Sequence, residues 1–138
     1  MNYCLMDAGF LYALFDDSDV HSLPVRKCVG KIREEIVIPI PAVTETAYFI
    51  QKNLGQAALG DFAEDLSNMD VRFEAPTTQD YYRTSEVLRK YKDSNLDFVD
   101  ACIFAIAERL NITKILTIDR RHFGMFRPAH CDAFEILP

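Results

Sequence analysis

Carboxylates follow two apolar segments of this chain that have the composition of buried strands. Asp7 comes directly after residues 3–6, and Asp119 comes directly after residues 114–118. Ligands of open parallel sheets bind beyond the carboxyl ends of the strands, so both side chains are expected where a site would form. Glu45 falls in the first turns of the helix predicted after the second strand, near the same edge.

A further pair of carboxylates begins a long apolar segment. Asp97 and Asp100 are three residues apart, which places them on one face of a helix. Residues 98–107 are apolar apart from Asp100, and a helix that is apolar on most sides is buried. A buried carboxylate needs a partner or a metal ion. Two cations near in the sequence, Arg109 and Lys114, belong at the other end of this helix.

Several carboxylates that converge without matching cations indicate a divalent metal site. Ligation by oxygen alone suits Mg²⁺, for which Mn²⁺ can substitute. We predict that Asp7, Asp100 and Asp119 hold the ion, with Asp97 as a further metal ligand. Glu45 would complete a second metal site or orient the attacking water. The chemistry expected of such a site is metal-assisted hydrolysis of a phosphodiester.

Three of these residues have a structural alternative that the sequence leaves open. Asp119 could begin the turn after its strand. Asp97 could belong to a capping box that starts at Ser94. Glu45 could be a solvated side chain that the helix dipole favours. The three histidines share no ligand spacing, so they are predicted to be surface or core residues: His21, His122 and His130.

Composition limits the classes of protein to which this chain can belong. It has 138 residues, 49% of them hydrophobic, which is enough for one globular domain spanning residues 1–138. A net charge of −6 disfavours broad coating of nucleic acid, but it says little about a small metal-dependent pocket. Four cysteines without paired spacing, no secretory signal and no long apolar run together predict a cytoplasmic protein without a membrane segment.

Helical and strand-like segments alternate along the chain. The capping-box pattern from Thr77 to Asp80 marks one helix start, and Gly55 marks a helix end. This alternation predicts an α/β fold with a mostly parallel central sheet flanked by helices. The predicted strands are 3–6, 36–40, 71–73, 114–118 and 133–137, and the predicted helices are 9–15, 20–35, 41–54, 56–69, 77–92 and 98–110.

Four segments, in this order and spacing, resemble the PIN domain. They are MDAGFLYAL (6–14), PAVTE (41–45), LDFVDA (96–101) and LTIDRRHF (116–123). The chain is most similar to VapC-like ribonuclease toxins of type II toxin–antitoxin (VapBC-type) operons. The resemblance covers nearly the whole chain, including the closing residues 133–138, and is most specific from 96 to 123. It implies a PIN-like three-layer fold and a magnesium-dependent endoribonuclease.

The resemblance also implies roles for individual residues. Asp7, Glu45, Asp100 and Asp119 match the acidic quartet of the family, with Asp97 as an extra acidic neighbour, and Thr117 matches a supporting hydroxyl position. Many members have Thr or Ser directly after the first aspartate, where this chain has Ala8 and Gly9, so any hydroxyl contact there is lost. The implied partners are an RNA substrate, a cognate antitoxin and a second copy in a homodimer. Three arginines could meet RNA phosphates: Arg120, Arg121 and Arg127.

Two other functions compete with this interpretation. The first is a non-catalytic PIN-like module that binds RNA or protein, against which the complete acidic set argues. The second is a magnesium-dependent phosphohydrolase of small molecules, but no DxDxT-like segment follows Asp7. For the antitoxin, the apolar residues Phe10, Leu14 and Phe15 are expected to line a docking groove. The alternative is that all three pack in the core, and for Leu14 this alternative is favoured.

Overall fold

A parallel sheet of five strands forms the centre of the computed structural model, which describes residues 2–138. The strand order is β3-β2-β1-β4-β5, and each pair of neighbours is parallel. The order places β1 in the middle with β4 beside it, so the carboxyl ends of these two strands are adjacent. The strands are β1 (Tyr3–Met6), β2 (Glu35–Pro39), β3 (Arg72–Glu74), β4 (Lys114–Leu116) and β5 (Glu135–Leu137).

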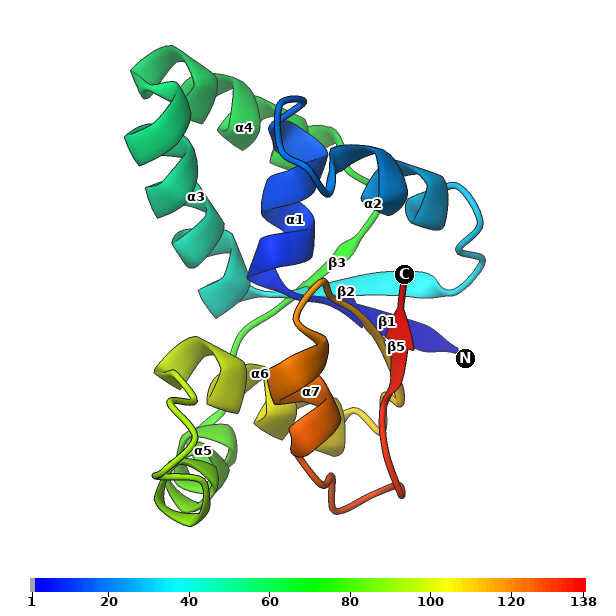
Figure 1. Cartoon of the computed structure of the whole chain (residues 1–138), viewed down its shortest axis with the longest axis vertical. Helices are drawn as coiled ribbons and strands as arrows, with labels where there is room; N and C mark the ends of the chain where they lie inside the picture. Colours follow the sequence, from blue (N-terminus) through cyan, green and yellow to red (C-terminus); the bar gives the residue numbers. More distant parts are fainter. Residues whose placement is uncertain (1) are drawn as a thin grey trace.

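Helices cover both faces of the sheet, which gives the three layers that the sequence predicted (Figure 1). The layer over one face consists of α1 (Ala8–Phe15), α2 (Ser22–Val29), α3 (Ile40–Leu54) and α4 (Gln56–Asn68). The layer over the other face consists of α5 (Thr78–Lys90), α6 (Phe98–Arg109) and α7 (Arg120–Met125). Helix α3 also contacts α6.

The core explains why the central segments are continuous apolar runs. Cys4, Leu5 and Met6 of β1 have no exposed surface, because a central parallel strand is covered on both faces. Residues 101–107 of α6 are likewise buried. Among residues 2–138, none of the helices combines the length and hydrophobicity that crossing a bilayer requires.

The predicted ends of two helices are confirmed. The Thr77 hydroxyl accepts a hydrogen bond from the Asp80 amide at 3.1 Å, and the Asp80 carboxylate accepts one from the Thr77 amide at 2.9 Å, which completes the capping box. Gly55 separates α3 from α4 with a φ of +94°, a conformation that L side chains rarely adopt.

Several element boundaries differ from the prediction. The helix predicted over 20–35 is confined to α2, because the Asp19 carboxylate accepts a hydrogen bond from the His21 amide in a turn before it, and β2 begins at Glu35. The strand predicted over 114–118 ends at Leu116. The short helix α7 was not predicted.

Candidate metal centre

Asp7 is held at the junction of β1 and α1. It follows the last residue of the strand and caps the helix, where its Oδ1 accepts a hydrogen bond from the Phe10 amide at 2.9 Å. Its Oδ2 accepts a hydrogen bond from the Thr117 hydroxyl. Only 4% of Asp7 is exposed. Its carboxylate is therefore buried and has a fixed orientation.

Thr117 links the two aspartates that follow β1 and β4. Its hydroxyl donates to Asp7 and accepts a hydrogen bond from the Asp119 amide at 2.9 Å. Asp119 in turn caps α7, because its Oδ1 accepts a hydrogen bond from the His122 amide at 3.0 Å. Thr117 is itself buried, so this hydroxyl sets the relative position of the two carboxylates.

Helix α6 brings two more carboxylates to the same edge. Asp97 is its N-cap residue and accepts a hydrogen bond from the Asp100 amide at 2.8 Å. The alternative in which Asp97 helps to begin this helix is therefore confirmed, but the cap is Asp97 itself and not Ser94. The Asp100 side chain is 15% exposed, as its place at the start of a buried helix implies.

Glu45 reaches the cluster from α3. The adjacent Thr46 is buried and donates a hydrogen bond from its hydroxyl to the Ala8 carbonyl at 3.1 Å, which ties the start of α3 to the start of α1. Glu45 is half-buried. The charges of Asp7, Asp97, Asp119 and Glu45 all act on Asp100, so these five carboxylates lie near one another at the carboxyl ends of β1 and β4. We call them the acidic cluster, of which Asp97 is the exposed member.

Burial and mutual repulsion raise the pKa values within the acidic cluster. Burial raises the pKa of Asp7 to about 7, with smaller contributions from the charges of Asp119 and Glu45, while the Thr117 and Phe10 hydrogen bonds oppose the rise. Burial, followed by the charge of Asp97 and then the other carboxylates, raises the pKa of Asp100 to about 8. The pKa of Glu45 is also raised, by burial and then by Asp97.

The acidic cluster fits a divalent cation. Within residues 2–138, no Lys or Arg forms an ion pair with any of its carboxylates, and the nitrogen-bearing side chain that reaches it is the imidazole of His122. Buried carboxylates that repel one another require positive charge in order to ionise at neutral pH. Their oxygen atoms are the ligands that Mg²⁺ and Mn²⁺ prefer.

His122 is a site residue that the sequence analysis missed. Its Nδ1 lies 2.9 Å from Oδ2 of Asp119 and 3.7 Å from Oδ2 of Asp100. One potential ligand atom from each of these three residues falls within 4.8 Å of the other two. The signal was the spacing of Asp119 and His122, since side chains three residues apart share one helix face. Recognising it required the prediction of α7.

The three arginines predicted to contact RNA have different surroundings. The Arg120 guanidinium donates hydrogen bonds to the carbonyls of Ile136 and Pro138, at the end of the chain. The Arg127 guanidinium donates to the carbonyl of Gly124 at 2.7 Å, near the last turn of α7. Arg121 is exposed, and within residues 2–138 its side chain forms no hydrogen bond or ion pair.

The predicted docking groove of Phe10, Leu14 and Phe15 is wrong for Phe10, which has no exposed surface. Phe15 is partly buried and packs edge-on against Phe62 with ring centroids 4.9 Å apart, and Leu14 packs against the same core. The surface between α1 and α3 instead has a hollow of about 210 Å³, lined by residues that include Tyr12, Glu45, Phe49 and Asn53.

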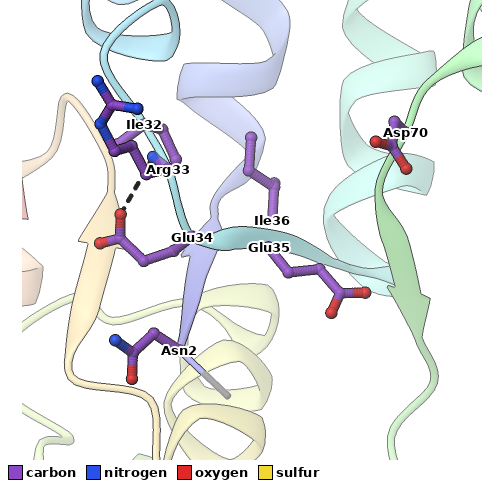
Figure 2. Close-up of a pocket in the computed structure, with 7 residues that line it drawn as sticks. All are labelled: Asn2, Ile32, Arg33, Glu34, Glu35, Ile36 and Asp70. Carbon is purple, nitrogen blue, oxygen red and sulfur yellow. Dashed lines mark hydrogen bonds between the residues drawn. The ribbon is translucent and has the colours of Figure 1, made fainter.

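A larger hollow, of about 750 Å³, lies at the opposite edge of the sheet (Figure 2). Asn2 precedes β1, Glu35 begins β2 and Asp70 precedes β3, so this hollow faces the amino ends of the strands. The Arg33 amide donates to the carboxylate of its neighbour Glu34 at 3.2 Å. Parallel sheets bind ligands at the other edge, which favours the acidic cluster as the functional site.

Known proteins share both the sequence pattern and the fold. The PIN domain family model matches residues 4–125. Ribonuclease VapC26 of Mycobacterium tuberculosis is 25% identical over 134 residues, which cover 97% of this chain and 99% of the relative. The crystal structure of Mycobacterium tuberculosis VapC20, a sarcin–ricin loop cleaving toxin, matches with a TM-score of 0.85 at 18% identity, and the match covers 98% of this chain and 99% of the VapC20 chain. The structure of DNA-bound VapBC from Salmonella typhimurium matches with a TM-score of 0.73 at 15% identity, over 99% of this chain and 97% of the matched chain.

Proposed function

The chain belongs to the PIN domain family, and we propose that it is a magnesium-dependent endoribonuclease that serves as the toxin of a toxin–antitoxin pair. The observation that carries this proposal is the acidic cluster, in which Asp7 is buried and held by two hydrogen bonds, Asp100 is largely buried, and no carboxylate has a Lys or Arg partner within residues 2–138. The names of the relatives, a ribonuclease and a toxin that cleaves the sarcin–ricin loop, support RNA as the substrate.

Each residue of the acidic cluster has a role in the proposed reaction. Asp7, Asp100 and Asp119 would hold Mg²⁺, or Mn²⁺ in its place, with Asp97 as an additional ligand. When bound, the ion supplies positive charge for the phosphate and makes a water molecule more acidic. Glu45, whose raised pKa suits proton transfer, would orient the attacking water.

The surrounding residues keep this arrangement fixed. The Thr117 hydroxyl holds the carboxylate of Asp7 in one orientation, which spares the ordering of that group when metal and substrate bind. Arg120, Arg121 and Arg127 remain the proposed contacts to RNA phosphates. Arg121 is the most available of the three, because the other two guanidinium groups already donate to backbone carbonyls.

An antitoxin is the proposed protein partner. The solved relatives include VapBC complexes, and the hollow between α1 and α3 leads to Glu45 of the acidic cluster. A peptide that lies in this hollow could extend an Arg or Lys to the carboxylates, with which charged hydrogen bonds are strong. Co-expression with the neighbouring gene, followed by co-purification, tests this partner.

A homodimer is also proposed. A hollow of about 600 Å³ with exposed aromatic side chains lies beside Glu45, where Tyr48, Phe49, Tyr81 and Phe98 are each at least 40% exposed. Exposed apolar surface of this kind marks interaction sites, and a second copy is the proposed occupant. Analytical ultracentrifugation of the purified chain checks the dimer.

We propose a cytoplasmic location, where RNA and the antitoxin would be available.

Cleavage of RNA in the presence and absence of chelator tests the catalytic proposal. Wild-type protein with Mg²⁺ should cleave RNA, and excess chelator should stop the reaction. The matched pair Asp100→Asn and Asp61→Asn separates the acidic cluster from general effects, because Asp61 is exposed on α4. Hydrolysis of p-nitrophenyl phosphate without RNA cleavage would favour a small-molecule phosphohydrolase. Cleavage of neither substrate, under conditions where the protein binds RNA, would favour a non-catalytic module.

A further inference from the structure

Both ring nitrogens of His122 have polar neighbours. Nδ1 faces Oδ2 of Asp119 at 2.9 Å and Oδ2 of Asp100 at 3.7 Å. On the other side of the ring, Nε2 lies 3.2 Å from the carbonyl oxygen of Ser94. The side chain is only 18% exposed, so these protein atoms provide most of its polar surroundings.

The Ser94 carbonyl offers a partner for one nitrogen of the ring and leaves the other for a cation. A carbonyl oxygen can only accept a hydrogen bond, so a ring that is hydrogen-bonded to Ser94 donates from Nε2. In the neutral form of such a ring, the lone pair of Nδ1 faces the carboxylate oxygens of Asp119 and Asp100, and a cation placed there would contact one ligand atom from each of the three residues. Histidines that bind metals are held in this way, with one nitrogen on the ion and the other donating to a carbonyl or carboxylate.

Helix α7 fixes the ring from two further directions. The Asp119 carboxylate caps the helix through the His122 amide, so the carboxylate and the imidazole move together. The next residue, Phe123, is buried and packs edge-on against Phe104 of α6, with ring centroids 4.9 Å apart. Asp100 lies on that same helix α6, and the contact therefore holds His122 at a fixed distance from it.

We infer that His122 is a nitrogen ligand of the divalent ion that Asp100 and Asp119 hold, and that it shifts the preference of the site from Mg²⁺ toward Mn²⁺. Imidazole is a good ligand for transition metals, whereas Mg²⁺ prefers oxygen. The inference rests on the proposed metal-dependent function, because it adds a ligand to the same site. The competing view is that a charged imidazolium ring acts as a built-in cation that occupies the place of the metal.

Electron spin-echo spectroscopy of Mn²⁺ bound to the whole chain tests the ligand directly. Wild-type protein should show ¹⁴N modulation from a directly coordinated imidazole, and labelling with ¹⁵N-histidine should replace it with ¹⁵N modulation. The modulation should be lost in His122→Gln and kept in His21→Gln. His21 is an exposed residue whose side chain does not cap α2, so its variant is the matched control.

Metal titrations provide the second measurement. His122→Gln should bind Mn²⁺ at least about 10-fold more weakly than wild type, with a smaller loss for Mg²⁺. Tighter Mn²⁺ binding by this variant would identify the imidazole as a competing cation and overturn the inference. Wild-type protein that binds Mn²⁺ without nitrogen modulation would overturn it while leaving the proposed function intact. Wild-type protein that binds neither ion would overturn both. Should His122→Gln not fold, the ¹⁵N-labelled wild-type spectrum alone decides.

Discussion

Replacing Asp100 with Asn should stabilise the metal-free protein and abolish RNA cleavage. Asn has nearly the same shape as Asp, but it cannot ionise. The variant therefore removes a buried charge that other carboxylates repel, while α6 and its N-cap from Asp97 to the backbone amide at position 100 remain intact. The same change removes a proposed metal ligand. Stability and activity should therefore move in opposite directions.

The magnitude follows from the raised pKa of Asp100. Burial and the neighbouring carboxylates raise this pKa from 3.8 to about 8. Between these values the folded state binds more protons than the unfolded state, so the free energy of unfolding falls as pH rises, by about 1.4 kcal/mol per pH unit for one proton. The free energy of unfolding that this charge can cost has an upper bound of about 6 kcal/mol above pH 8. Relaxation of the protein and entry of solvent reduce that cost, so we expect Asp100→Asn to gain about 2 kcal/mol or more in free energy of unfolding at pH 8.

Urea unfolding in the presence of chelator, from pH 4 to pH 9, measures this effect. The two proteins should have similar stability near pH 4, where Asp100 is neutral, and the advantage of the variant should increase up to about pH 8. Asp61→Asn is the control and should follow wild type at every pH, because Asp61 is exposed. A variant that is less stable than wild type at pH 8 without metal, or one that still cleaves RNA, would refute this reasoning.

Three further perturbations test a hydrogen bond within the acidic cluster, a helix cap and the binding of the metal ion. Thr117→Val removes the hydroxyl that donates to Asp7, which should raise the Asp7 pKa further. The variant should unfold with a free energy lower by about 1–3 kcal/mol at pH 8 and should cleave RNA more slowly. Unchanged stability would contradict the role of this hydrogen bond. Thr77→Ala removes the capping box with Asp80 and should cost about 1 kcal/mol in urea unfolding without changing the cleavage rate, because the Thr77 hydroxyl bonds to the Asp80 amide and not to the acidic cluster. Added Mn²⁺ should increase the free energy of unfolding of wild type by about 2.7 kcal/mol at 100 times Kd, seen as an unfolding temperature that rises with Mn²⁺ concentration, and should do so far less for Asp100→Asn; an equal rise in both would place the ion elsewhere.

The sequence determined the fold class because local signals and the alternation of elements agreed. The apolar run before Asp7 indicated a buried strand, and the capping box at Thr77 and the glycine at position 55 marked helix ends by local chemistry. These features depend on residues near one another in the chain, so they can be read without tertiary structure. The boundary errors at 20–35 and 114–118 arose where turns, rather than periodicity, end the element.

The sequence also indicated which carboxylates should matter. Asp7 and Asp119 follow apolar strands, and Asp100 lies within an apolar helix, so burial of charge was already implied. The positions of these carboxylates relative to the predicted strands and helix indicated that they should face one edge of a parallel sheet. Those positions did not indicate which carboxylates would be deeply buried or which hydrogen bonds would orient them.

Only the tertiary structure decided the details of the acidic cluster. The contact of Thr117 with Asp7 spans 110 residues and depends on β4 lying beside β1. His122 enters the cluster because α7 forms after β4 and packs on α6, an arrangement that no local pattern specified. Phe10 does not line the predicted groove, because the sheet and the helices around it bury its side chain completely. Local sequence fixes which groups can do chemistry, but distances between groups from remote segments arise only when those segments pack together.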